Sequence, residues 1–130
     1  MFATVFLLLY VGHLLADYPF QTDHQAAHKA DPGTAGWRAN LSHAAAHIAA
    51  CAFALLAGMA FLDLHISTWA AYGALAWIGG THAFIDRRWP VRWWMHRFDQ
   101  TGWAANGGAA HVDQTAHITA LALAALVLAA

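Results

Sequence analysis

The stretch IGGTHAFIDRRW, residues 78–89, places a histidine and an aspartate four positions apart at the end of an apolar run. Ionisable groups are costly inside an apolar membrane helix, and where they occur they usually serve a function. The i, i+4 spacing puts His82 and Asp86 on one face of a helix, about 6 Å apart along its axis. The stretch therefore predicts a polar site built into an apolar helical protein.

The composition agrees with this prediction. The chain has 130 residues, enough for one domain, and is 60% hydrophobic but only 10% charged. An ordinary soluble domain has about 25% charged residues. The formal net charge of −1 gives no electrostatic basis for binding nucleic acid. The composition indicates a membrane protein whose surroundings are lipids.

Four apolar segments have the length of a membrane-spanning helix, which needs roughly 20 residues. They cover residues 2–18, 37–61, 67–89 and 108–130. We expect Pro19 to end the first and Pro90 to end the third, because the residue before a proline disfavours helix. The sequence thus predicts an all-α protein: an integral membrane four-helix up-down bundle in a single domain.

The polar links predict shorter helices and an orientation. A helix begun by Thr22 or Asp23 is expected in the first link. In the third link a short interfacial helix is expected, because four apolar residues share one helical face: Val91, Trp94, Met95 and Phe98. Lysine and arginine occur only in or beside these two links. The positive-inside rule therefore predicts a multi-pass protein of the bacterial cytoplasmic (inner) membrane with both termini outside.

Each predicted span carries one pair of ionisable residues with i, i+4 spacing, and an up-down bundle brings all four pairs to the cytoplasmic end. The pairs are His13 with Asp17, His43 with His47, His82 with Asp86, and Asp113 with His117. Imidazole and carboxylate groups are ligands for Zn, Mn or Fe, and one ion needs three or four of them. Eight candidates therefore predict a divalent transition-metal cofactor, with enough ligands for two ions.

The four pairs are also compatible with a proton or ion relay and with a purely structural polar core. His24 and His28 repeat the spacing in a polar link, where a solvated surface helix accounts for them. Gln21, Asp23 and Gln114 are candidates for orienting the ligands or carrying protons.

Several of these motifs together resemble a family of small bacterial and phage membrane proteins, domain-of-unknown-function family 3307. The likeness covers nearly the whole chain and rests on HLLADYPFQTD (13–23), Lys29, the His43/His47 pair, THAFID (81–86) and DQTAH (113–117). The chain departs from the family pattern in the long link before DQTAH and in His24, where an aromatic residue is expected. The resemblance implies a multi-pass membrane protein and no particular activity. A weaker likeness to membrane-bound metal-dependent hydrolases is analogy.

We expect first a metal-dependent hydrolase that acts on a lipid or lipid-linked (phospho)ester at the cytoplasmic leaflet. Asp17 or Asp86 would accept the proton of a metal-activated water. The alternatives are a transporter of metal, protons or a small solute, and a non-enzymatic membrane scaffold or phage accessory or lysis protein. The outer halves of the second and fourth spans contain almost no polar residues, which disfavours transport. A homo-oligomer is compatible with each function.

Overall fold

The computed structural model describes residues 1–130 and is helical throughout, which confirms the all-α prediction. Four long helices account for most of the chain: α1 (Phe2–Asp17), α3 (Gly33–Phe61), α4 (Thr68–Ile85) and α7 (Ala109–Ala129). Shorter elements lie in the links between them: α2 (Asp23–His28), α5 (Trp89–Arg97), α6 (Thr101–Trp103) and the π-helical segment η1 (Ala104–Gly108).

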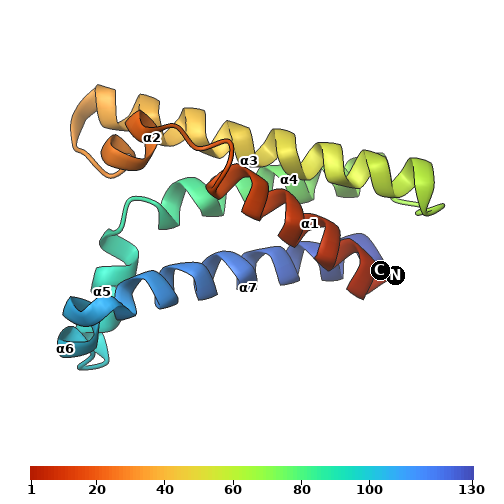
Figure 1. The fold of residues 1–130 in the computed structure, drawn as a ribbon. Helices are drawn as coiled ribbons and strands as arrows, with labels where there is room; N and C mark the ends of the chain where they lie inside the picture. Colours follow the sequence, from red (N-terminus) through yellow and green to blue (C-terminus); the bar gives the residue numbers. More distant parts are fainter.

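The four long helices are arranged as an up-down bundle. Each packs against the next along the chain, and α7 closes the ring against α1. Figure 1 shows both termini together at one end and α2, α5 and α6 at the other. The end of α1, the start of α3, the end of α4 and the start of α7 therefore meet at the end that carries α2 and α5.

An apolar core fills the half of the bundle nearer the termini. Val5 and Leu9 of α1 belong to one buried cluster with residues of the other three long helices, among them Leu55, Ile78 and Leu121. The single cysteine, Cys51, is part of this cluster and forms no disulfide. The polar half of the bundle is therefore joined to an apolar half whose buried cluster contains no ionisable side chain besides this thiol.

Two helix boundaries differ from the sequence-based prediction. Helix α3 begins at Gly33, four residues before the predicted span, because Pro32 takes the N-cap position. Helix α4 ends at Ile85 instead of Trp89, because Arg88 adopts a left-handed conformation with φ of 61°. Pro90 therefore does not end α4. It lies in the first turn of α5, where proline is tolerated because the backbone N–H there has no partner in the helix.

Both predicted link helices are present. The side chain of Thr22 accepts from the backbone N–H of Gln25, and the side chain of Gln25 accepts from that of Thr22, which forms a capping box at the start of α2. In α5 only Val91 and Met95 of the predicted apolar face are buried, against Ile85. Trp94 and Phe98 remain about half exposed, at 49% and 51%.

Two helical stretches, Gly33–Phe61 and Thr101–Ala129, are long and apolar enough to cross a membrane. Helix α1 has 16 residues and α4 has 18. Length and composition thus identify two candidate spans where the sequence predicted four. Helix α4 contains tryptophan, tyrosine, threonine, histidine and three glycines, which dilute its apolar residues.

The close packing of α1 on α3 at Gly12 is testable. A Cβ atom there would lie 3.1–3.2 Å from backbone atoms of Ala50 and Cys51, so Gly12→Leu should destabilise the fold by about 1–3 kcal/mol or more through overpacking. Gly73→Leu in α4 is the matched control, because a Cβ atom at that position would have no neighbour within 4 Å. Thermal unfolding of both variants in detergent checks this, and equal melting temperatures would contradict the close approach.

Candidate metal centre

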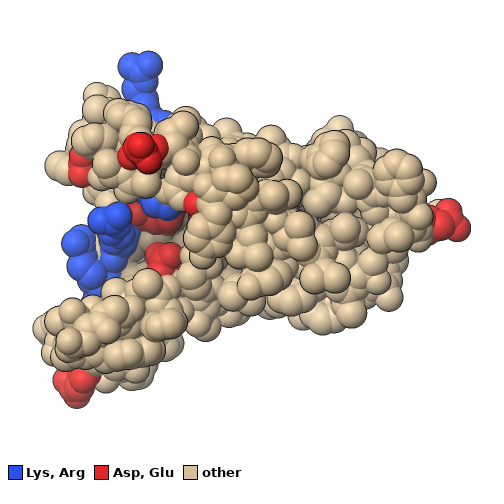
Figure 2. Space-filling view, in the orientation of Figure 1, with Lys and Arg blue, Asp and Glu red and all other residues tan.

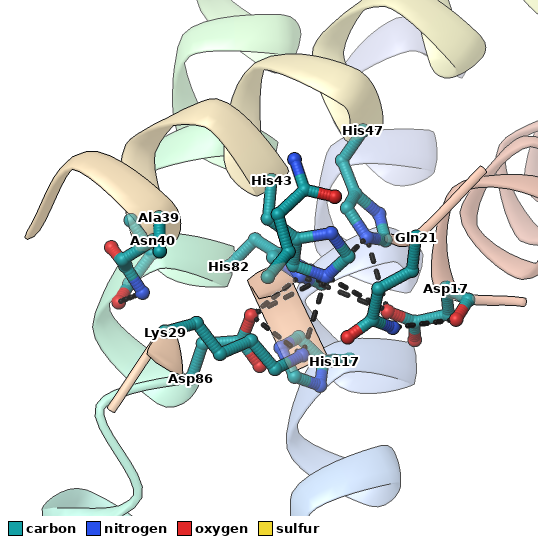
Figure 3. A network of polar contacts seen from close by, with 12 residues as sticks. Asp17, Gln21, Lys29, Ala39, Asn40, His43, His47, His82, Asp86 and His117 are labelled. Atoms are coloured by element: carbon teal, nitrogen blue, oxygen red, sulfur yellow. Dashed lines mark hydrogen bonds and ion pairs between the residues drawn. The ribbon is translucent and has the colours of Figure 1, made fainter. Parts of the chain in front are cut away.

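The four predicted pairs converge at the end of the bundle that carries α2 and α5. Figure 3 shows imidazole and carboxylate side chains from all four long helices pointing into one space. The rings of His47 and His82 are stacked with centroids 3.5 Å apart, and those of His82 and His117 are 4.3 Å apart. Spacing within each helix puts each pair on one face, and the up-down topology brings these faces together.

Asp17 is the centre of a first group of ligand-type residues. Its Oδ1 atom lies 3.1 Å from Nε2 of His47, 3.3 Å from Nε2 of His43 and 3.9 Å from Nε2 of His82. One ligand atom from each of these four residues lies within 4.8 Å of the others. Most of these atoms already hydrogen-bond or pair with one another, so the group is a compact polar network that could also hold an ion.

His82, Asp86 and His117 form a second group, again with ligand atoms within 4.8 Å of one another. All three side chains are buried, with 2–3% of their surface exposed. Nε2 of His82 lies 3.1 Å from Oδ2 of Asp86, but the two atoms are not aligned for a hydrogen bond. Neither ring nitrogen of His117 has a hydrogen-bond partner.

This second group fits a divalent metal ion. A buried polar atom without a hydrogen bond costs about 1–3 kcal/mol, and coordination by one cation would remove this cost for the two histidines. The carboxylate of Asp86, which is paired with Lys29 at 3.0 Å, would be the third ligand. Two imidazoles and one carboxylate are the donor set of many catalytic zinc and non-haem iron sites, which keep further coordination positions open. We call His82, Asp86 and His117 the histidine–aspartate trio.

The remaining two predicted residues lie beside the two groups. Nε2 of His13 is 3.2 Å from Oδ2 of Asp17. Oδ2 of Asp113 is 3.4 Å from Nδ1 of His117, and Asp113 is 25% exposed. The structure thus brings six of the eight predicted residues into the two groups and leaves His13 and Asp113 in positions suited to orienting Asp17 and His117.

The polar residues predicted to assist these ligands have different roles. Gln114 does reach the site, where its Nε2 donates to Oδ2 of Asp17 at 3.3 Å. Gln21 instead donates to the backbone carbonyl of Asp17 at the end of α1. Asp23 is exposed as the first residue of α2. His24 and His28 are exposed on α2, as predicted for a solvated helix.

Lys29 is a site residue whose position the sequence did not indicate. Its Nζ atom lies 3.0 Å from Oδ2 of Asp86 and 3.3 Å from Nε2 of His43. Arg87 holds this segment in place by donating to the backbone carbonyls of Lys29 at 2.9 Å and Asp31 at 2.7 Å. Its guanidinium group also stacks over the ring of Trp37, 4.5 Å from the centroid. Two signals pointed to Lys29, its place among the residues that carry the family resemblance and its being the single lysine of the chain, and neither indicated a contact with Asp86.

Asn40 was also missed. Its side chain is fully buried on α3, and its Nδ2 donates to the backbone carbonyl of Ala83 on α4 at 3.1 Å. This hydrogen bond joins α3 to α4 close to the site. Asn40 lies one turn before His43 on α3, and Ala83 lies three residues before Asp86 on α4. An asparagine three residues before a ligand-type histidine carried no spacing signal.

The pairing of Lys29 with Asp86 predicts a specific loss of stability in the metal-free protein. Lys29 is 14% exposed and Asp86 is 3% exposed. Removing one partner of a buried pair costs roughly 3–5 kcal/mol, so Lys29→Met should cost about 3 kcal/mol because Lys29 keeps some contact with solvent. Arg38→Met, at an exposed cation near the start of α3, should change little. Chemical or thermal unfolding in chelator compares the two variants, and equal stability would contradict the pairing.

Comparison of this chain with known proteins identifies a family. No match is found among curated proteins or among solved structures. The model of a family described as protein of unknown function (DUF3307) matches residues 5–130. The matched range includes every residue of the two groups and the Lys29 segment. The chain therefore belongs to the DUF3307 family.

Proposed function

We propose that the protein is an intramembrane metal-dependent hydrolase that acts on a lipid or lipid-linked (phospho)ester at the cytoplasmic leaflet. The observation that carries this proposal is the histidine–aspartate trio. Its ligand atoms are buried, lie within 4.8 Å of one another and have no aligned hydrogen bonds. Lys29 offsets the charge of Asp86, but the ring nitrogens of His82 and His117 keep a cost that a bound cation would remove, and three protein ligands leave coordination positions for water and substrate.

The surface of the bundle supports a location in the membrane. Large apolar side chains are exposed around the bundle, including Phe53 at 73%, Trp69 at 82% and Leu126 at 54%. In Figure 2 the charged residues gather mainly at one end, which Figure 1 identifies as the end with α2 and α5. The link between α3 and α4, at the opposite end, has Asp63 as its single acidic residue and contains no lysine or arginine. We infer four membrane helices in a bacterial inner membrane, with the basic end in the cytoplasm and both termini outside.

The residues of the site suit hydrolysis of an ester. A bound zinc, manganese or iron ion supplies Lewis acidity and lowers the pKa of a coordinated water towards neutrality. In this proposal His82, Asp86 and His117 hold the ion, and the carboxylate of Asp17 accepts the proton of the attacking water. Asp17 is suited to this role because its Oδ1 atom lies 3.9 Å from Nε2 of His82. Lys29 contributes a positive charge beside an anionic substrate group.

A second ion is compatible with the same site. Asp17, His43 and His47 would be its ligands, since their ligand atoms also lie within 4.8 Å of one another and His82 serves the first ion. Asp17 would then be a ligand and not the proton acceptor. Transport is less well supported, because the apolar cluster around Leu9, Leu55 and Leu121 fills the bundle beyond the site. Passage of an ion through that half would require polar groups, and the cluster contains none except the thiol of Cys51.

Metal binding is predicted to depend on the histidine–aspartate trio. Purified wild-type protein should contain about one equivalent or more of a transition metal, and His82→Ala with Asp86→Ala should lower it at least about tenfold, because only one ligand of the trio remains. His28→Ala with Asp31→Ala is the matched control, since this exposed pair is also joined at 2.7 Å. Elemental analysis after supplementation with zinc, manganese or iron measures the content. Less than about a tenth of an equivalent in the wild type would refute the proposed metal site.

Turnover is predicted to depend on Asp17 separately from metal content. Metal-loaded protein in vesicles of mixed phospholipids should release hydrolysed lipid, detected by mass spectrometry. Asp17→Asn should lower the rate by roughly 10²-fold or more because it removes the proton acceptor, while the trio still holds its ion. The control with both His28 and Asp31 replaced by alanine should retain the wild-type rate. A metal-loaded wild type without turnover on any ester tested would instead indicate a metal-stabilised scaffold.

A further inference from the structure

A long apolar groove runs along the outside of the bundle between α4, α5 and α7. Its volume is about 850 Å³, and 12 of the 18 residues that line it are hydrophobic. Five of the seven tryptophans of the chain line it: Trp77, Trp89, Trp93, Trp94 and Trp103. The volume is that of a site for a small molecule, and the walls offer few polar groups.

The dimensions of the groove match one leaflet of a bilayer. Along α7 it extends from His111 to Leu123, which at 1.5 Å per residue is about 18 Å. Half of the hydrocarbon thickness of a bilayer is about 15 Å. The groove begins at the charged end of the bundle and runs towards the termini, which is the direction of an acyl chain in the cytoplasmic leaflet of the proposed membrane.

The groove reaches the histidine–aspartate trio through a thin wall. A small cavity beside His82 and His117 shares two wall residues, Thr81 and Ala120, with the groove. The hydroxyl of Thr81 donates to the backbone carbonyl of Trp77 at 2.7 Å, so it cannot also donate to a ligand in this arrangement. A chain lying in the groove therefore passes within one side-chain layer of the candidate metal ligands at Thr81 and Ala120, nearer the deep end of the groove than its charged end.

Two kinds of contact shape the groove: one joins α4 to α7 along its floor, and the other forms a wall at the start of α7. Nε1 of Trp77 donates to the backbone carbonyl of Ala120 at 3.0 Å and so joins α4 to α7 along the groove floor. The ring of Trp103 packs directly on Gly108, where any Cβ atom would overlap the ring. The ring also stacks parallel to that of His111, with centroids 6.2 Å apart. Trp103 thus forms a fixed end wall at the start of α7.

The positive charge of α5, beside the groove, favours an amphiphile with an anionic head group. Residues 87–97 include four arginines and no acidic residue, and the exposed Arg88 and Arg92 each precede a tryptophan that lines the groove, Trp89 and Trp93. We infer that the groove binds an acyl chain of an anionic glycerophospholipid, whose phosphate meets these arginines. This inference rests on the proposed function, because it names the substrate class of the same site.

Lipid retention in chelator tests this inference without any need for metal or turnover. Native mass spectrometry would count phosphatidylglycerol molecules bound to the detergent-purified full chain. Leu123→Trp fills the deep end of the groove, and Leu126→Trp is the matched control on the same helix outside it. The two leucines are 47% and 54% exposed.

Wild type and Leu126→Trp should each retain about one long-chain phosphatidylglycerol, and Leu123→Trp should retain it at least about fivefold less, because several methylene groups lose their burial. Short-chain phosphatidylglycerol should bind both leucine variants equally, and phosphatidylcholine or tail-free glycerophosphate should bind wild type more weakly. Equal retention by the two leucine variants would overturn the inference. So would a dimer that Leu123→Trp dissociates, because a second copy would then cover the groove. A failure of hydrolysis alone would leave the lipid result unchanged.

Discussion

Two buried carboxylates impose the constraint on which the polar half of this protein depends. Asp17 is 8% exposed and Asp86 is 3% exposed, in a bundle whose other half is packed with hydrocarbon. A buried charge is tolerated only when it is paired and hydrogen-bonded. Asp17 is compensated by histidines from its own helix and α3 and by Gln114 of α7. Asp86 is compensated by Lys29, which requires the chain after α2 to fold back over the site.

The compensation is incomplete in both groups. Nδ1 of His43 and of His47 has no hydrogen-bond partner, and in the trio neither Nε2 of His82 nor either ring nitrogen of His117 has one. Native proteins leave few buried polar atoms unsatisfied, and those that remain commonly have a functional cause. The apolar cluster that includes Leu9, Leu55 and Leu121 supplies the packing that keeps such an arrangement folded. The apolar packing at one end of the bundle thereby offsets the free-energy cost of the buried polar atoms at the other end.

The sequence predicted those parts of the site that depend on local spacing. The i, i+4 pairs, the all-helical class and the meeting of the pairs at one end followed from periodicity and chain direction. Lys29 and Asn40 did not, because their contacts cross from one helix or link to another and no spacing rule encodes them. The predicted end of α4 was four residues too late, because Pro90 was expected to end the helix. The break is instead the left-handed conformation of Arg88, which an arginine seldom adopts.

The contact between Arg87 and the segment after α2 determines which positions of that segment can be substituted. Its guanidinium group recognises two backbone carbonyls, those of Lys29 and Asp31, and neither of their side chains. Hydrogen bonds to backbone carbonyls depend on the path of the backbone, and most residue types along it can provide the same carbonyl. The exposed positions of this segment can therefore be substituted without loss of the contact, while Lys29 is still held beside Asp86.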